Sequence, residues 1–258
     1  MKNGFTLVEL SIVLVIIGLL IGGILVGQSL IESSKLNSFV RQIQQYDSAI
    51  MTFKDKYKGL PGESGLTTTV AGWGVSSVKK DGLLTDDDWQ MNTTNYAAAG
   101  SEEYMLVWKE LATLGYLKVP NCPNLATTAP AGNAPKTNGA NCNMPLSSYG
   151  ANKNIMIVAA AYTNPNFTTN FNKGNAYYTA DCSAQVGSAW NCAAPFTQLE
   201  AMTYDAKVDD GKNNSGNVLG GTIFSGFRPV IQFNNISVPY DINSTTNMVL
   251  VQRFANGL

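Results

Sequence analysis

The residues that could act as nucleophiles, acids or bases are limited by one absence, because this chain of 258 residues contains no histidine. Ser-His-Asp and Cys-His catalysis are therefore excluded, together with the commonest zinc ligand sets of hydrolases. Ser76 and Lys79 fit the S-x-x-K spacing of penicillin-recognising enzymes, but the S-D-N and K-T-G companions of that motif are absent. No clustered pair of carboxylates points to a glycosidase. The sequence therefore favours a protein that is not an enzyme.

Two acidic clusters could bind calcium through carboxylate oxygens. The first consists of three aspartates at positions 86–88, in a glycine-rich segment where an acidic run is usually a solvated turn. The second consists of Asp205, Asp209 and Asp210, which are followed by further oxygen-rich residues. The EF-hand spacing is not met there. A structural turn and a calcium site both stay open for this cluster, with the turn favoured, and no other cofactor is expected.

All four cysteines lie within residues 59–258, the part of the chain expected outside the cytoplasm. An even number of cysteines there suits disulfide bonds in an oxidising compartment. Four cysteines allow three pairings. The spacing favours the local pairs, Cys122 with Cys142 and Cys182 with Cys192. A zinc site is the weaker alternative, because the chain lacks both histidine and a C-x-x-C spacing.

One charged residue, Glu9, interrupts the apolar stretch at residues 5–31. The uncharged part, residues 10–27, would extend about 27 Å as a helix, close to the roughly 30 Å hydrocarbon core of a bilayer. A removable secretory signal would carry a small-residue cleavage site after this stretch, and no A-x-A-like pattern follows Leu25. We therefore expect the segment to remain in the protein as a membrane span.

The residues around Glu9 also carry a family resemblance. Behind a leader of four residues, the chain resembles the class III leader of type IV pilins and type II secretion pseudopilins, with the sequence Gly4-Phe5-Thr6-Leu7-Val8-Glu9-Leu10. The resemblance implies that a prepilin peptidase cuts between Gly4 and Phe5 on the cytoplasmic side, and that the new amino group of Phe5 is methylated. It is specific over about the first thirty residues. Beyond them it is architectural.

Glu9 lies where a carboxylate loses its hydration. An unpaired charge at the centre of a membrane helix costs on the order of 3 kcal/mol, so such residues are usually paired or functional. The resemblance supplies a partner, the positive amino terminus of Phe5 on a neighbouring subunit. The alternative is that Glu9 lies near the interface in the first helical turn, stabilised by the helix dipole and by water. We expect pairing, through which Glu9 sets the axial register between subunits.

The helix is predicted to continue beyond the membrane. Apolar residues recur at spacings of three and four from Leu36 to Tyr57, which places them on one helical face. Gly59 and Pro61 then form a common helix stop, so one helix is predicted over residues 5–58. A coiled-coil dimer is the alternative use of this stripe. Its aromatic members favour packing under a globular head instead.

The rest of the chain is predicted to form one head with an antiparallel sheet. Residues 62–100 have little periodicity and are expected to be an irregular connection, whereas residues 101–115 have the pattern of a helix whose apolar face includes Leu114. Thr197 and Glu200 fit a capping box that opens a short helix. Strands are predicted at residues 155–161, 176–179, 217–224, 229–233 and 248–254.

The predicted fold class is therefore α+β, with a long N-terminal helix packed on a head that contains an antiparallel sheet. The helix has a membrane-spanning first half and an amphipathic second half. The expected organisation is a leader at residues 1–4, a transmembrane and filament-core helix at 5–31, its amphipathic continuation at 32–58, and an extracytoplasmic head at 59–258.

The resemblance implies a structural subunit of a type IV pilus or a type II secretion pseudopilus. It would be a single-pass protein of the bacterial inner membrane, with a cytoplasmic N-terminus and a periplasmic or extracellular head. Its expected partners are copies of itself, other pilin-like subunits, the prepilin peptidase, an inner-membrane assembly platform and membrane lipid. Nucleic acid is not expected, because 17 basic residues stand against 18 acidic ones. A membrane-tethered binding or adhesin domain is the alternative, and a membrane-anchored enzyme is less favoured.

Overall fold

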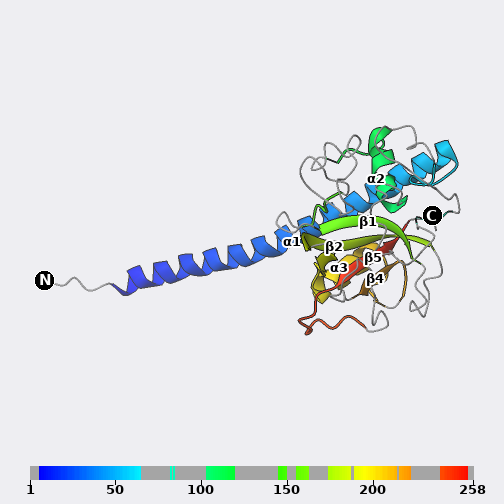
Figure 1. Cartoon of the computed structure of the whole chain (residues 1–258). Coiled ribbons are helices and arrows are strands. Elements are labelled where there is room, and N and C mark those ends of the chain that lie inside the picture. The colour runs from blue at the N-terminus through cyan, green and yellow to red at the C-terminus, as the bar shows by residue number, and fades with distance from the viewer. Residues whose placement is uncertain are drawn as a thin grey trace.

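The computed structural model describes residues 6–64, 82, 84, 103–119, 145–149, 155–162, 174–186, 189–213, 215–221 and 239–254. One long helix projects from a head in which two shorter helices and an antiparallel sheet lie beside its far half (Figure 1). The predicted α+β class and the antiparallel sheet are confirmed. The irregular connection predicted at residues 62–100 lies almost wholly outside the described residues.

Helix α1 (Leu7–Tyr57) is continuous for 51 residues, a length of about 76 Å. Thr6 is its N-cap. At the other end Lys58 takes the left-handed conformation, with φ 58°, and its backbone N–H donates to the Lys54 carbonyl at 2.8 Å. The single helix predicted over residues 5–58 is therefore confirmed.

The two halves of α1 differ completely in burial. Up to Ile31, its large apolar side chains are between 46% and 87% exposed. The second half instead buries a stripe against the head, which consists of Leu36, Phe39, Ile43, Tyr46, Ala49, Ile50 and Phe53. The amphipathic prediction is confirmed, and the head of the same chain covers the stripe where a coiled-coil partner would otherwise be needed.

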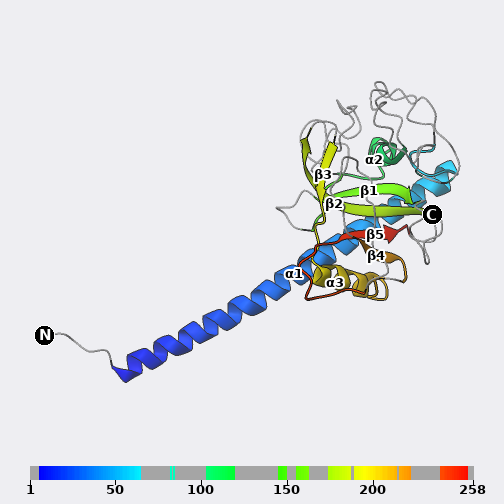
Figure 2. The same ribbon diagram turned by 60° about the horizontal axis from the view of Figure 1, so that its bottom comes forward.

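Within the described residues the sheet has five strands, all paired antiparallel, and its central order is β1-β2-β5-β4 with β3 joined to β2 (Figure 2). The strands are β1 (Ile155–Tyr162), β2 (Gly174–Val186), β3 (Ala189–Ala193), β4 (Val218–Gly221) and β5 (Val249–Arg253). Four of the five predicted runs contain a strand. The run at residues 229–233 lies outside the described residues, and β3 was not predicted. Strand β5, from the end of the chain, lies between β2 and β4 and so completes the sheet.

Helix α2 (Glu103–Thr113) is buried along its second half, where residues 106–111 are each at most 1% exposed. Leu114 was predicted to lie on its buried face and is 39% exposed, so that prediction was wrong. The helix ends at Thr113, and Gly115 then takes φ 77°, which turns the chain away from the helical path. A side chain beyond the last turn no longer shares the face of the helix.

Helix α3 (Gln198–Val208) begins at the predicted capping box. The Glu200 backbone N–H donates to Thr197 Oγ1 at 3.2 Å, and the Thr197 N–H donates to Glu200 Oε2 at 2.7 Å. Two of the helix's first unpaired N–H groups are thereby satisfied. The helix crosses α1 at the first buried turn, since the Tyr204 and Phe39 ring centroids are 5.0 Å apart.

Aromatic rings hold the second half of α1 against the head along its whole length. The ring centroids of Phe39 and Phe196 are 5.9 Å apart. Further along the helix, Tyr46 meets Trp108 edge-on, with ring centroids 4.8 Å apart. Near the end of α1, the ring centroids of Phe53 and Tyr116 are 6.0 Å apart. Each such pair contributes roughly 0.5–1.5 kcal/mol beyond the burial of its area.

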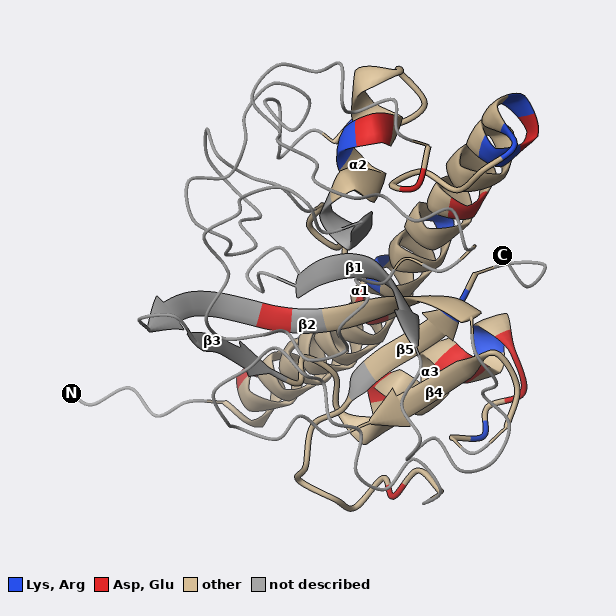
Figure 3. Cartoon of the chain, turned by 45° about the vertical axis from the view of Figure 1, so that its right-hand side comes forward, with Lys and Arg blue, Asp and Glu red and all other residues tan. Residues whose placement is uncertain are grey.

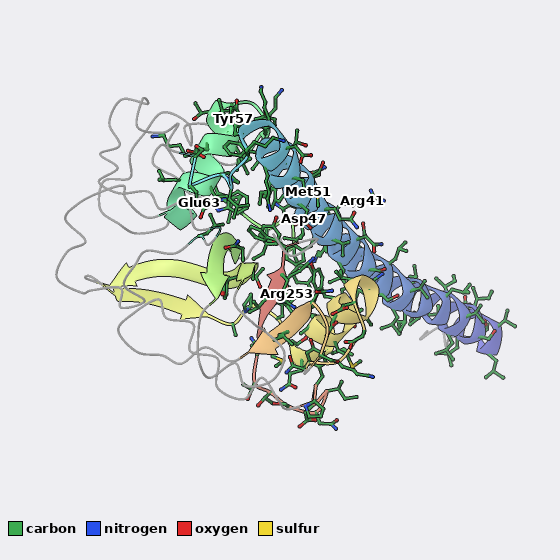
Figure 4. All side chains as sticks on the ribbon, turned by 90° about the vertical axis from the view of Figure 1, so that its right-hand side faces the viewer. Arg41, Asp47, Met51, Tyr57, Glu63 and Arg253 are labelled. Atoms are coloured by element: carbon green, nitrogen blue, oxygen red, sulfur yellow. The ribbon has the colours of Figure 1, made fainter. Side chains whose placement is uncertain are left out.

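One polar contact lies within this aromatic interface. Tyr177 of β2 donates its hydroxyl hydrogen to Asp47 Oδ1 at 3.0 Å. Figure 4 shows Asp47 on the side of α1 that faces the head, whereas Arg41 points away from it. The hydrogen bond fixes the rotation of α1 relative to the sheet, because a helix turned about its axis would lose it.

We predict that Phe53→Ala lowers the free energy of unfolding of the head by about 3–5 kcal/mol, since a fully buried ring leaves a cavity beneath α2 and α1. Guanidinium unfolding of the full chain in detergent micelles, followed by tryptophan fluorescence, measures the loss. Leu114→Ala is the matched control, because the side chain is partly exposed, and it should cost much less. Equal losses for the two variants would contradict the described packing.

Candidate processing and assembly site

The first turn of α1 contains a second capping box, formed by Thr6 and Glu9. The Glu9 N–H donates to Thr6 Oγ1 at 3.2 Å, while the Thr6 N–H and hydroxyl donate to Glu9 Oε2 at 2.8 and 2.9 Å. All of these groups are exposed. Glu9 therefore already has a partner within its own chain.

The capping box defines where the helix starts relative to the predicted cleavage. Thr6 is the N-cap, so α1 begins two residues after Phe5. Within the described part of the chain both side-chain bonds end on Oε2, and Oε1 faces no other donor of α1. Gly4 and Phe5 themselves lie outside the described residues.

Thr6 is a residue that the sequence analysis missed. The T-x-x-E spacing of Thr6 and Glu9 is the same signal that correctly predicted α3 from Thr197 and Glu200. In the first turn of α1 this signal is masked by the apolar residues that surround Thr6 and Glu9. The helix-dipole alternative for Glu9 is thereby strengthened, since its carboxylate does lie in the first turn.

The first half of α1 offers the surface on which such a helix would assemble. It is the one helix among the described residues that is long and apolar enough to span a membrane, and none of its most apolar 18-residue window is buried. At Gly18, Gly22, Gly23 and Gly27, no atom other than those of the adjacent residues and the nearby backbone of the helix itself lies within 4 Å of where a Cβ would be. The helix passes through all of them without a break, and close approach of another helix is open at each.

The three aspartates of the second acidic cluster do lie together, with ligand oxygens within 4.8 Å of one another. Figure 3 shows acidic positions gathered at the end of α3 and in the turn that follows it. Each carboxylate also accepts hydrogen bonds from its own turn. Asp209 accepts from the N–H groups of Asn217 and Val218, and Asp210 accepts from Lys212 N–H at 2.9 Å.

Asp205 is the buried member of this cluster. Its carboxylate accepts from the Tyr240 hydroxyl at 2.9 Å and from the Gly211 N–H at 3.2 Å. Burial raises its pKa to about 6, partly opposed by these two hydrogen bonds, and the neighbouring Asp210 and Asp209 raise it further. Tyr240 could not have been found from the sequence, because it lies 35 residues away and only the fold brings it to Asp205.

This donor set resembles a capped turn more closely than a ready-made cation site. Asp209 ties the end of α3 to the start of β4, while Asp205 and Asp210 accept from backbone N–H groups within the turn that follows α3. A calcium ion prefers 6–8 oxygen ligands, and it would have to share oxygens that already accept hydrogen bonds. The structural turn is therefore favoured, and calcium binding here stays a prediction.

The remaining sequence-predicted residues are placed unevenly. Cys182 and Cys192 lie on the paired strands β2 and β3, beside the pair Asp181–Ala193. The two cysteines of the other predicted disulfide, Cys122 and Cys142, lie outside the described residues. So do Ser76 and Lys79 of the S-x-x-K segment and the three aspartates at positions 86–88.

Comparison with known families agrees with the N-terminal geometry. Residues 1–25 match the family model described as the prokaryotic N-terminal methylation motif. No curated protein and no solved structure matches the chain. The motif is that of type IV pilins and pseudopilins, so the resemblance seen in the sequence is confirmed.

The long exposed helix, its capped start and this motif together define a pilin-like or pseudopilin-like protein. Proteins with the motif assemble with other pilin-like subunits and are substrates of a prepilin peptidase, and the motif family is structural rather than catalytic. The apolar helix is a candidate membrane anchor.

We predict that Asp205 makes the head more stable as the pH falls from 7 to 5. Its pKa is higher in the folded state than its ordinary 3.8, so the folded state binds the proton more tightly and gains about 1 kcal/mol over that interval. Asp205→Asn removes this gain. Unfolding of both proteins at the two pH values, with a chelator present, measures the difference between them.

The other carboxylates titrate in both proteins, so their effect cancels in this comparison. If the difference in unfolding free energy between wild type and Asp205→Asn were the same at both pH values, the buried, hydrogen-bonded position of Asp205 would be contradicted. Melting of the wild type with calcium in place of the chelator tests the metal alternative, and a clear rise in Tm with calcium would overturn the structural turn.

Proposed function

We propose that this protein is a structural subunit of a type IV pilus or a type II secretion pseudopilus. It is processed between Gly4 and Phe5, methylated at Phe5, and assembled through the first half of α1. The observation that supports this most is one continuous helix whose first half is wholly unburied and carries the methylation motif, while its second half forms the core of the head.

The unburied half needs an apolar environment at every stage. Its exposed side chains would be covered by lipid while the subunit waits in the inner membrane, and by neighbouring helices in a filament. The leader then lies on the cytoplasmic side with the single basic residue Lys2, and the head lies outside the cytoplasm. An inner-membrane assembly platform would transfer the subunit from one environment to the other.

Glu9 takes part in two interactions in this proposal. Within the chain it caps the start of α1 through Oε2. In the filament its charge neutralises the amino terminus of Phe5 on the neighbouring subunit. A charge left alone among packed apolar helices is costly, so subunits pair where Glu9 meets an amino group, and this fixes their axial register.

We predict that Glu9→Gln abolishes filament assembly but leaves the protein inserted in the membrane and processed. Glutamine is a competent capping-box residue, so this variant keeps the helix start and loses only the charge. Thr6→Ala is the matched control, because it weakens the cap by about 1 kcal/mol and keeps the charge. Electron microscopy of sheared filaments and mass spectrometry of the membrane fraction provide the readouts.

If Glu9→Gln gave filaments at the wild-type yield, the proposed pairing of Glu9 with the amino terminus of Phe5 would be contradicted. Failure of Thr6→Ala with success of Glu9→Gln would show that capping alone matters. A wild-type mass that still includes the leader, or that lacks one methyl group at Phe5, would contradict the proposed processing.

We also propose a disulfide between Cys182 and Cys192 in the oxidising compartment outside the cytoplasm. The two residues lie on facing antiparallel strands next to the pair Asp181–Ala193. The register of the two strands shifts between Asp181 and Ala184, so the cysteines lie beside a paired position rather than at one. Directly opposed residues in such strands have Cα atoms about 4.5–5.5 Å apart, and a disulfide spans up to about 6.8 Å, which leaves room for such an offset. The proposed pairing of Cys122 with Cys142 then follows by elimination.

We predict that Cys182→Ser lowers the free energy of unfolding by about 2–3 kcal/mol, as expected for a short closed loop. Cys192→Ser and the double variant should cost the same, because either single change already breaks the bond. Denaturant unfolding without reductant measures the three losses. Additive losses in the double variant would contradict the pairing, as would a digest in which the two cysteines are recovered as free thiols.

A further inference from the structure

Two exposed aliphatic side chains lie on segments of the head that are far apart in sequence but hydrogen-bonded to each other. Leu199 is 54% exposed and Ile242 is 60% exposed. Gln198, the neighbour of Leu199, joins the two segments: its Oε1 accepts from the Asp241 N–H at 2.5 Å and its Nε2 donates to the Thr246 carbonyl at 3.5 Å. The first turn of α3 thus holds both ends of the loop at residues 241–246.

The loop presents Ile242 in a fixed position. The Ser244 N–H donates to the Asp241 carbonyl at 2.9 Å, and the Asn243 N–H donates to Asp241 Oδ1 at 3.0 Å. These bonds close a β-turn in which Ile242 and Asn243 are the central residues. Ile242 is at the tip of a polar turn and does not pack into the core of the head. Its side chain can therefore be buried only by something outside the head.

This part of the head lies at the end nearest the apolar half of α1. Lys207, at the end of α3, donates to Asn37 Oδ1 at 3.1 Å, and Tyr204 packs on Phe39. Figures 1 and 2 both show α3 and the red C-terminal loop at that end, displaced to one side of the α1 axis. We refer to α3 together with residues 239–247 as the underside of the head.

The length of α1 sets the distance between the underside and a bilayer. Asn37 lies six residues beyond Ile31, about 9 Å along the helix, whereas the headgroup zone is roughly 5–8 Å thick on each side. The exposed apolar half, residues 7–31, is about 37 Å long and exceeds the roughly 30 Å hydrocarbon core. A span that is too long tilts. A tilt toward α3 brings the underside down to the headgroups.

We propose that the underside of the head docks on the lipid headgroups of the membrane that holds α1, with Ile242 and Leu199 inserted between them. This inference rests on the proposed storage of the subunit as a single-span membrane protein. Docking would fix the direction in which α1 tilts, and it would have to be released when the subunit leaves the membrane for a filament.

The charges on this end of the chain show no excess of basic residues. Lys35 and Lys207 are exposed, whereas the acidic residues Glu32 and Asp241 are exposed and Glu200 of α3 is partly exposed. Long lysine side chains can reach phosphate groups while the aliphatic side chains insert. Because basic residues are not in excess here, burial of the two aliphatic side chains drives docking, which should therefore occur on zwitterionic lipid without any need for anionic lipid.

The test uses the full chain in nanodiscs of zwitterionic lipid. Ile242→Trp and Leu114→Trp each add one tryptophan at an exposed aliphatic position, the first on the underside and the second next to α2. Lipid brominated on its acyl chains quenches tryptophans that insert near them. We expect the fluorescence added by Ile242→Trp to be quenched at least about twofold more than that added by Leu114→Trp, because interfacial side chains enter about 5–10 Å.

A second variant tests the cooperation of the two aliphatic side chains. In the Ile242→Trp background, Leu199→Ser should lower the ratio of docked to undocked heads about fivefold, and Leu114→Ser should leave it unchanged. Equal quenching at positions 242 and 114, or an unchanged ratio with Leu199→Ser, would overturn docking. Quenching that requires anionic lipid would overturn the assignment to aliphatic insertion.

These failures are distinguishable from failure of the proposed function. Alkaline extraction of the same preparations reports whether α1 spans the membrane. Protein that resists extraction but shows no added quenching at position 242 would overturn docking and leave the filament-subunit proposal intact. Shielding of position 242 from a soluble quencher only in assembled filaments would assign the underside to a neighbouring subunit, and would overturn lipid docking.

Discussion

The structure depends on one helix that serves two environments. Helix α1 is about 76 Å long, and the head buries only the stripe that begins at Leu36. No rearrangement of a head this size could also cover the apolar first half without breaking the helix. That half must therefore be covered by lipid or by other helices. The proposed membrane location and the proposed assembly both rest on this single constraint.

The second half of α1 acts as the core element of the head. Phe39, Tyr46 and Phe53 meet rings from α3, α2 and the turn that follows α2, so these separate parts of the head all contact the same helix. Strand β5 completes the sheet from the far end of the chain and lies between β2 and β4. A force or displacement applied to the apolar half is consequently transmitted straight into the core. Such a rigid connection suits a subunit that is pulled from a membrane by its head or its helix.

Local features were predictable because they depend on neighbours in sequence. The helix length, the buried stripe, the class of the sheet and the capping box of α3 all follow from spacing and from side-chain type. Leu114 failed because helical spacing was extended past the point where Gly115 turns the chain. Strand β3 was missed because a short strand with few strongly apolar residues has a weak pattern. At the candidate site, Glu9 was found from its isolation, whereas its cap Thr6 was overlooked.

The sequence by itself determined the apolar span, the motif around Gly4 and Phe5, and the single charge at Glu9, because each depends only on the types of residues that follow one another in one continuous segment. Only the tertiary structure decided how the buried carboxylate Asp205 is held by Tyr240, and why the aspartate cluster behaves as a capped turn. It also decided that the start of α3, which carries Leu199, is hydrogen-bonded to the turn that carries Ile242. Contacts of this kind join segments whose separation along the chain carries no periodic signal, so they exist only once the head has folded around its helix.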